Sequence, residues 1–337
     1  MMAREGDLIE ATDGNIFDVK GLVHPPDKVI AFIRFTPDPK GERQRDNQRF
    51  RKVYPLQERY ELLKEKFPQY LVFDRVFNEW MCEVPTDSIR RHYKPQKCLN
   101  RLRRKTITQE LEKQTLQLAQ LLIQEASIPW KALGISGSLL VGLQGETSDI
   151  DLIVYGAANC QKVHAALKSL IQDETSHVKP YTRFELKALF DFRSKDTNVS
   201  FEDFVRTESR KVLQGKFAQR DYFIRCIKEQ NEINEKYGSI IYEPLGEAKV
   251  KATIVDDSEM IYTPCSYKIE TNKILEGTRV ENLTEIASFR GRFCEQARRG
   301  EEVISRGKVE RVRRVDEKKH HFRLLLGNKP SDFMTPV

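Results

Sequence analysis

The stretch that decides the fold is residues 131–156, KALGISGSLLVGLQGETSDIDLIVYG. An apolar segment leads into Gly137 and Ser138, and a second apolar segment opens with Asp149 and Asp151. Glycine lets the backbone turn sharply and approach a ligand without a Cβ in the way. The order of apolar and polar segments predicts a strand, a Gly-Ser turn, a short helix, a polar loop and a second strand.

The two aspartates have the spacing of a metal site. On a strand, residues two positions apart leave the same face, so both carboxylates would project together, about 7 Å apart along the backbone. Two like charges on an otherwise apolar strand are costly unless a cation neutralises them, and oxygen ligands suit Mg²⁺ or Mn²⁺. A helix that begins near Ser138 would point free N–H groups at a phosphate. The segment therefore predicts a site for a divalent cation and a phosphate.

This pattern resembles the signature of the nucleotidyltransferases related to DNA polymerase β. Members of that superfamily carry an apolar-Gly-[Gly/Ser] turn, roughly ten residues, and then Asp-apolar-[Asp/Glu]-apolar. Here residues 139–148 separate Gly137-Ser138 from Asp149-Ile-Asp151. The whole chain also resembles uncharacterised archaeal proteins known as predicted nucleotidyltransferases, which adds no substrate.

The resemblance implies an α+β fold with a mixed-sheet, palm-like core. It also implies a transferase that moves a nucleoside monophosphate from a nucleoside triphosphate such as ATP to an acceptor hydroxyl. In that family the residues that match Asp149 and Asp151 hold the metal and are catalytic, and those that match Gly137 and Ser138 hold the phosphates. Small members often have an arginine where this chain has Val141. The phosphates would then be held by backbone groups and by a cation from elsewhere in the chain.

The superfamily also places a third acid on a neighbouring strand, where it completes metal binding and takes the proton of the attacking hydroxyl. Asp221 opens an apolar run at 221–227 and is the first candidate for this metal-binding and catalytic role. Asp256 and Asp257, at the end of an expected strand at 249–255, are the rivals. Both assignments have a structural alternative, because an aspartate at a strand end also serves as a cap or a turn residue.

Basic residues supply further candidates for anion binding. Arg210 and Lys211 lie late in an expected helix at 201–214 and could meet the triphosphate, although basic side chains are also favourable at a helix C-terminus without any ligand. Residues 298–323 contain ten Lys and Arg against five acids. If Arg311 and Arg313 lie on a strand, they share one face, with phosphate spacing in reach; the alternative is a solvated strand face. The net charge of +7 also favours an anionic partner, so RNA or another nucleic acid is the candidate acceptor.

The remaining sequence predicts secondary structure of two kinds. Residues 7–35 have the β-branched and aromatic character of strands, whereas 55–92 suggest helices interrupted by prolines. Residues 106–126 have apolar positions at helical spacing. Candidate strands recur after Gly238, in a pattern typical of a small barrel or sandwich.

These signals divide the chain into three parts, since 337 residues suffice for two or three domains. We predict an N-terminal α+β region at 1–96 with no assigned role. A nucleotidyltransferase core follows at 97–237, and a β-rich, basic domain at 238–337.

Composition and sequence patterns limit the cellular locations that we expect for the protein. The six cysteines lack the paired spacing of a metal site, the N-terminus lacks the apolar core of a signal peptide, and no uncharged apolar run reaches the roughly 18 residues of a membrane span. We therefore expect a cytoplasmic protein without a membrane partner. Nothing in the sequence specifies an oligomeric state.

Two alternatives compete with the transferase. A glycosyltransferase also uses Asp-x-Asp, but that hypothesis leaves the Gly137-Ser138 turn unexplained. The second is a catalytically inactive nucleotide- or nucleic-acid-binding module of the same fold, which fits the valine at position 141 and the unassigned third acid.

Overall fold

The computed structural model describes residues 3–194, 198–317 and 319–337 and contains seven α-helices and three β-sheets among them, so the α+β class is confirmed. None of the described helices combines the length and apolar character that a membrane span requires. The chain folds into two compact units. The first comprises Met1–Val72, Met81–Pro180 and Val212–Ile233, and the second comprises Phe73–Trp80, Tyr181–Lys211 and Asn234–Val337.

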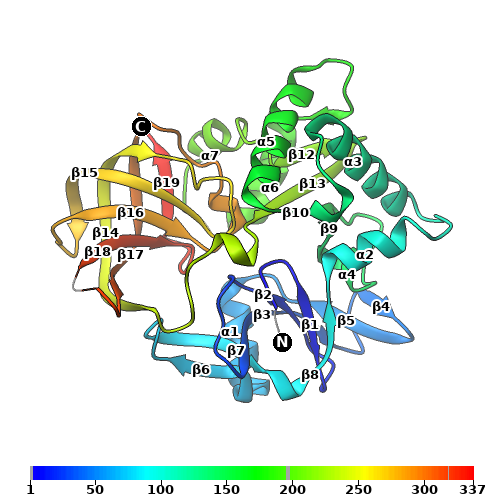
Figure 1. Cartoon of the computed structure of the whole chain (residues 1–337), viewed down its shortest axis with the longest axis horizontal. Helices are drawn as coiled ribbons and strands as arrows, with labels where there is room; N and C mark the ends of the chain where they lie inside the picture. Colours follow the sequence, from blue (N-terminus) through cyan, green and yellow to red (C-terminus); the bar gives the residue numbers. More distant parts are fainter. Residues whose placement is uncertain (1–2, 195–197, 318) are drawn as a thin grey trace. The chain divides into compact units, whose positions relative to one another are not determined.

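An antiparallel sheet, coloured blue to cyan in Figure 1, forms the N-terminal part of the first unit. Its strands are in the order β4-β5-β3-β2-β1-β8. Its apolar face packs on helix α1 through a core that includes Phe17, Ile33 and Leu63. The strands are β1 (Leu8–Ala11), β2 (Ile16–Val19), β3 (Lys28–Pro37), β4 (Arg43–Arg45), β5 (Gln48–Lys52) and β8 (Ile89–Tyr93), and α1 is Leu56–Lys66.

The prediction of helices at 55–92 is correct for α1 and wrong for the residues after it. That segment continues as β6 (Leu71–Asp74), β7 (Glu79–Pro85) and β8. The pairing of β7 with β3 and of β8 with β1 decides this outcome, because strand partners far away in the sequence complete the backbone hydrogen bonds.

A second sheet of the first unit carries the Asp149 segment. Its order is β11-β12-β13-β10-β9, and β10 runs parallel to β13 but antiparallel to β9, so the sheet is mixed. Helices α3 and α5 pack against each other and against β10 (Figure 1). The bounds are β9 (Leu133–Ile135), β10 (Ile150–Tyr155), β11 (Val178–Lys179), β12 (Gln214–Phe217), β13 (Arg220–Ile227), α2 (Pro95–Leu102), α3 (Glu110–Ala126), α4 (Gly137–Leu140) and α5 (Ala157–Gln172).

The second unit contains a closed barrel. Its strands pair in the ring β14-β15-β16-β18-β17, and β17 returns to β14; only β16 and β18 are parallel. This five-stranded Greek-key arrangement is the topology of the OB-fold. Alternate residues of β14, among them Val250 and Ile254, are buried inside, while Lys249 and Lys251 lie partly exposed outside.

The strands of this unit lie in the region after Gly238 where strands are expected, and two helices of the unit precede them in the sequence. The helices are α6 (Arg183–Arg193) and α7 (Phe201–Glu208), and the strands are β14 (Ile240–Asp256), β15 (Cys265–Gly277), β16 (Leu283–Ser288), β17 (Glu302–Arg314), β18 (His320–Leu326) and β19 (Phe333–Pro336). Residues 260–263, although rich in strand-forming side chains, form a turn and an isolated bridge before β15 and not a regular strand.

Candidate active site

The Gly-Ser turn and the aspartate strand are in direct contact in the first unit. Gly137 has a positive φ of 62°, and a Cβ placed on it would overlap the carboxylate of Asp151. The backbone N–H of Ser136 donates to the Asp151 carbonyl at 2.9 Å. Only glycine fits this position, because it tolerates the left-handed backbone and leaves room for the carboxylate.

The helix that follows the turn is short. Helix α4 begins at Gly137, as the spacing predicts, but ends at Leu140 after a single turn. A helix of this length contributes little macrodipole. Any anion here would be held by individual N–H and O–H groups of the turn.

Asp149 and Asp151 lie at the start of β10. Asp149 is exposed just before the strand, whose first residue is Ile150, and Asp151 is half-buried. Burial, and then the negative charge of Asp149, raise the pKa of Asp151 to about 7. Among the described residues, neither carboxylate accepts a hydrogen bond, and no basic side-chain nitrogen lies within 4 Å of either. Two neighbouring acids without a direct partner form an electrostatically unfavourable pair that a divalent cation would relieve.

The loop between the turn and the aspartates is held by Ser148. Its hydroxyl oxygen lies 3.1 Å from the Ser138 hydroxyl and accepts from the Gly145 N–H at 2.9 Å. Arg43 of β4 donates to the same oxygen at 3.2 Å. The Arg220 guanidinium donates to the Ser148 carbonyl at 2.7 Å. These bonds fix the backbone just before the first aspartate.

Asp221 lies on the strand next to the two aspartates. In the parallel ladder of β10 and β13, Asp151 is opposite Phe223, so Asp221 lies on the same face as Asp149 and Asp151. Its carboxylate, however, forms an ion pair with Lys216 of β12 at 2.9 Å. Within the described parts of the chain, no three His, Cys, Asp or Glu side chains are grouped closely enough to hold a metal ion.

The rival acids belong to the second unit, where Asp256 is the last residue of β14 and Asp257 leads into the turn that follows. Asp256 accepts a hydrogen bond from the Ser258 N–H at 2.9 Å, and this bond lowers the pKa of Asp256. Asp257 accepts from the Arg299 N–H at 3.1 Å. Both carboxylates therefore do what turn aspartates commonly do.

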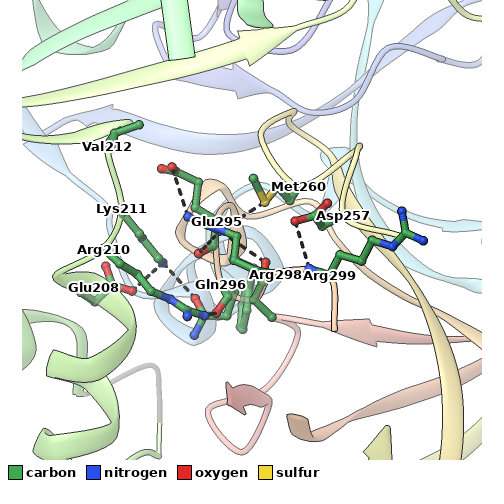
Figure 2. Close-up of polar contacts among 12 residues, drawn as sticks. Glu208, Arg210, Lys211, Val212, Asp257, Met260, Glu295, Gln296, Arg298 and Arg299 are labelled. Atoms are coloured by element: carbon green, nitrogen blue, oxygen red, sulfur yellow. Dashed lines mark hydrogen bonds and ion pairs between the residues drawn. The ribbon is translucent and has the colours of Figure 1, made fainter. Parts of the chain in front are cut away.

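Arg210 and Lys211 also have partners inside the second unit, which Figure 2 shows. The helix expected at 201–214 ends at Glu208, so both residues follow it. Arg210 binds both carboxylate oxygens of Glu301, at 2.5 and 2.8 Å. The buried Lys211 ammonium binds Glu208 at 2.5 Å and Gln296 at 2.9 Å. These contacts leave the proposed role in triphosphate binding without structural support.

Most of the basic side chains at 298–323 are likewise paired with acids. Arg311 contacts Glu243 at 3.0 Å, and Arg313 reaches the same carboxylate at 3.9 Å. Lys318 lies outside the described residues. Other pairs in this stretch are Arg306 with Glu247, Lys308 with Glu310, Arg314 with Glu317, His321 with Glu285 and Arg323 with Glu310.

The N-terminal sheet brings cations to the aspartates, which sequence reasoning missed. Burial, and then the charge of Arg34, lower the pKa of Lys52, while Asp149 and Asp151 act in the opposite direction. Arg34 and Lys52 lie over the ring of Tyr54, at 5.1 and 5.9 Å from its centroid. No local pattern could have revealed this, since the contact depends on packing between segments about 100 residues apart.

Comparison with known proteins gives one informative match. The chain is 31% identical over 342 residues to the uncharacterized protein MJ1086 of Methanocaldococcus jannaschii, an alignment that covers 99% of this chain and 98% of that protein. No family model matches the chain. No solved structure matches it either.

Proposed function

We propose that this chain is a metal-dependent nucleotidyltransferase of the DNA-polymerase-β superfamily. The chain belongs to the same family as the uncharacterized protein MJ1086, and the proposal extends to that family. One observation carries the proposal: the Gly137 turn lies against the Asp151 carboxylate, so the two halves of the signature form a single site. The mixed sheet of β9 to β13 would be the palm-like core.

The chain's own residues would position a nucleoside triphosphate. The N–H groups of the Gly137-Ser138 turn and the Ser138 hydroxyl would hold its phosphates. The acceptor oxygen forms a bond to the α-phosphorus, the bond from that phosphorus to the bridging oxygen of the β-phosphate breaks, and pyrophosphate leaves. The acceptor's proton passes to a carboxylate, for which Asp221 is the candidate. Positioning and charge neutralisation would supply most of the rate enhancement.

The donor set fits a divalent cation. Asp149 and Asp151 supply carboxylate oxygens, which Mg²⁺ and Mn²⁺ prefer, and a bound cation would remove the repulsion that raises the pKa of Asp151. When bound, the cation would neutralise triphosphate charge and stabilise the leaving pyrophosphate. Asp221 would complete the set if it exchanged Lys216 for the cation.

For the acceptor, we propose RNA or another nucleic acid. The net charge of +7 favours a polyanion, and barrels with the topology of the second unit bind oligonucleotides in other proteins. The ion pairs of β17 argue against Arg311 and Arg313 as the principal contacts.

The test of the activity is transfer of label. Purified protein is incubated with each α-labelled nucleoside triphosphate, with Mg²⁺ or Mn²⁺, and with RNA, DNA or protein acceptors. We expect transfer to at least one acceptor, and its loss in Asp149→Asn and Asp151→Asn. Transfer that persists when both aspartates are replaced would refute the proposal.

A second candidate is an inactive nucleotide- or nucleic-acid-binding module of the same fold. The ion pair of Asp221 with Lys216 favours it, because this pair leaves two acids where the superfamily uses three. Triphosphate binding that depends on Asp149 and Asp151, with no transfer to any acceptor, would identify this candidate.

A further inference from the structure

Arg34, Arg43 and Lys52 are basic side chains of the N-terminal sheet without an acidic partner among the described residues, whereas the nearby Arg45 and Arg51 each have one. Among the described residues, no carboxylate oxygen lies within 4 Å of the side-chain nitrogens of Arg34, Arg43 or Lys52. By contrast, Arg45 binds Glu10 at 3.0 Å, and Arg51 pairs with Asp38 and Glu58.

Strand pairing gathers these three groups. Arg43 is opposite Phe50 in the β4–β5 ladder, and Lys52 is two residues further on, so Arg43 and Lys52 share a face of the sheet. The ladder of β2 and β3 skips Arg34: Ile16 pairs with Phe35, and the next residue of β2 pairs with Ile33. Such a bulge redirects the side chain of the extra residue, which accounts for the position of Arg34 beside Lys52 on the Tyr54 ring.

The same cluster borders the Gly-Ser turn and the aspartates. Arg43 and Ser138 both contact the hydroxyl oxygen of Ser148, so one serine joins the cation to the turn. The Arg43 guanidinium also occupies the space that a side chain at Gly145 would need. The negative charges of Asp149 and Asp151 act to raise the pKa of Lys52, but Lys52 makes no ion pair with either carboxylate within 4 Å.

Cations and carboxylates that are this near, yet not directly paired, suit a ligand with charges of both signs. A metal–triphosphate complex is such a ligand, because its cation faces carboxylates and its phosphates face basic side chains. Arg45 is excluded, even though it donates to the Val141 carbonyl at 3.1 Å, because Glu10 already neutralises it.

We propose that Arg34, Arg43 and Lys52 of the N-terminal sheet bind the polyphosphate tail of the nucleoside triphosphate, in place of the arginine that Val141 replaces. This inference rests on the proposed function for its ligand. It also gives residues 1–96 a role, because a region that lies before the signature in the sequence would complete the substrate site.

The experiment measures phosphate binding separately from turnover. Calorimetry with inorganic tripolyphosphate and with ATP, each with Mg²⁺, compares the wild type with Lys52→Gln, Arg34→Gln and the double variant. Each single change should weaken binding about 10-fold, because a charge-assisted hydrogen bond is lost. The control is Arg49→Gln, which removes the same charge from the same strand on the face opposite to Lys52, where Arg49 donates to the Gly41 carbonyl.

The outcomes separate the two proposals. Unchanged affinity in folded Lys52→Gln and Arg34→Gln, equal losses in the Arg49→Gln control, or no binding by the wild type would overturn the phosphate site. Lys52-dependent tripolyphosphate binding in a protein that transfers no label would instead refute the nucleotidyltransferase and leave the phosphate site standing. Thermal unfolding of every variant identifies any that fail to fold, and Lys52→Arg should retain most of the affinity that Lys52→Gln loses.

Discussion

The Asp151 carboxylate fills the space that a side chain at Gly137 would occupy, and glycine, which has no side chain, leaves this space open. Two segments that are 14 residues apart in the sequence are thereby locked together at the candidate site. Any side chain at position 137 must move the carboxylate, the turn or both.

The first prediction follows from this contact. Gly137→Ala should abolish transfer. It should also lower the free energy of unfolding by more than about 1 kcal/mol, which is the cost of the left-handed backbone alone for a non-glycine residue. Gly142→Ala is the matched control, since Gly142 has a similar φ of 71° but a Cβ there would meet only the Arg45 side chain, at 3.6 Å. Unfolding free energies and transfer rates of the two variants provide the comparison. Equal effects would show that backbone strain alone, and not the Asp151 contact, matters.

The second prediction concerns the charge of Asp151. Its pKa is raised to about 7 from an ordinary 3.8, so the folded state holds this proton more tightly than the unfolded state. The resulting stabilisation is fully present below pH 3.8 and is lost as the pH rises through about 7. In a chelator, Asp151→Asn should therefore melt above the wild type near pH 8, and the difference should shrink towards pH 4.

Mg²⁺ provides the internal control of that experiment. A cation bound by the two aspartates should raise the melting temperature of the wild type at pH 8 and leave Asp151→Asn nearly unchanged. Melting curves with the same pH dependence in both proteins, or equal responses to Mg²⁺, would contradict the raised pKa of Asp151 and the metal site.

The third prediction decides the role of Asp221. If this residue completes the site, Asp221→Asn should reduce transfer at least 100-fold, whereas Lys216→Gln should retain it. If the carboxylate serves only Lys216, both variants should transfer normally and lose at most about 1 kcal/mol of stability, the usual worth of an exposed ion pair. Rates and unfolding free energies of the two variants distinguish these cases.

The parts of this molecule that the sequence could predict are those specified by nearby residues. The strands expected at 7–35 form, and the last of them is β3, because its β-branched and aromatic residues suit a half-buried sheet. Gly137 and Asp151 lie close enough in the sequence for their spacing to imply contact. The helices expected at 55–92 are wrong from residue 71 onward, because the partners of the strands that form there lie far away in the chain.

Charged groups were harder to predict for the same reason. The sequence shows Arg210 and Lys211 as adjacent cations near a helix end, but not the Glu301 carboxylate 91 residues away that binds the first of them. Conversely, it offers no sign that Lys52 lies near Asp149. Whether a basic residue is free for a ligand depends on acids that tertiary packing brings to it, and composition carries no information on that.

The last prediction tests the basic stretch of the second unit. Each phosphate neutralised by a protein cation contributes a slope of about −0.9 to the dependence of log affinity on log salt for duplex DNA, and about −0.7 for single strands. Arg311 and Arg313 share Glu243, and Arg314 pairs with Glu317, so none of the three is poised to take a phosphate. Replacing all three with glutamine should therefore leave the salt slope of RNA binding nearly unchanged. Binding of one RNA from 50 to 300 mM salt, in the wild type and the triple variant, gives the two slopes. A slope flattened by two units or more would mean that these arginines exchange their carboxylates for the nucleic-acid backbone, and the barrel would then be the acceptor-binding surface.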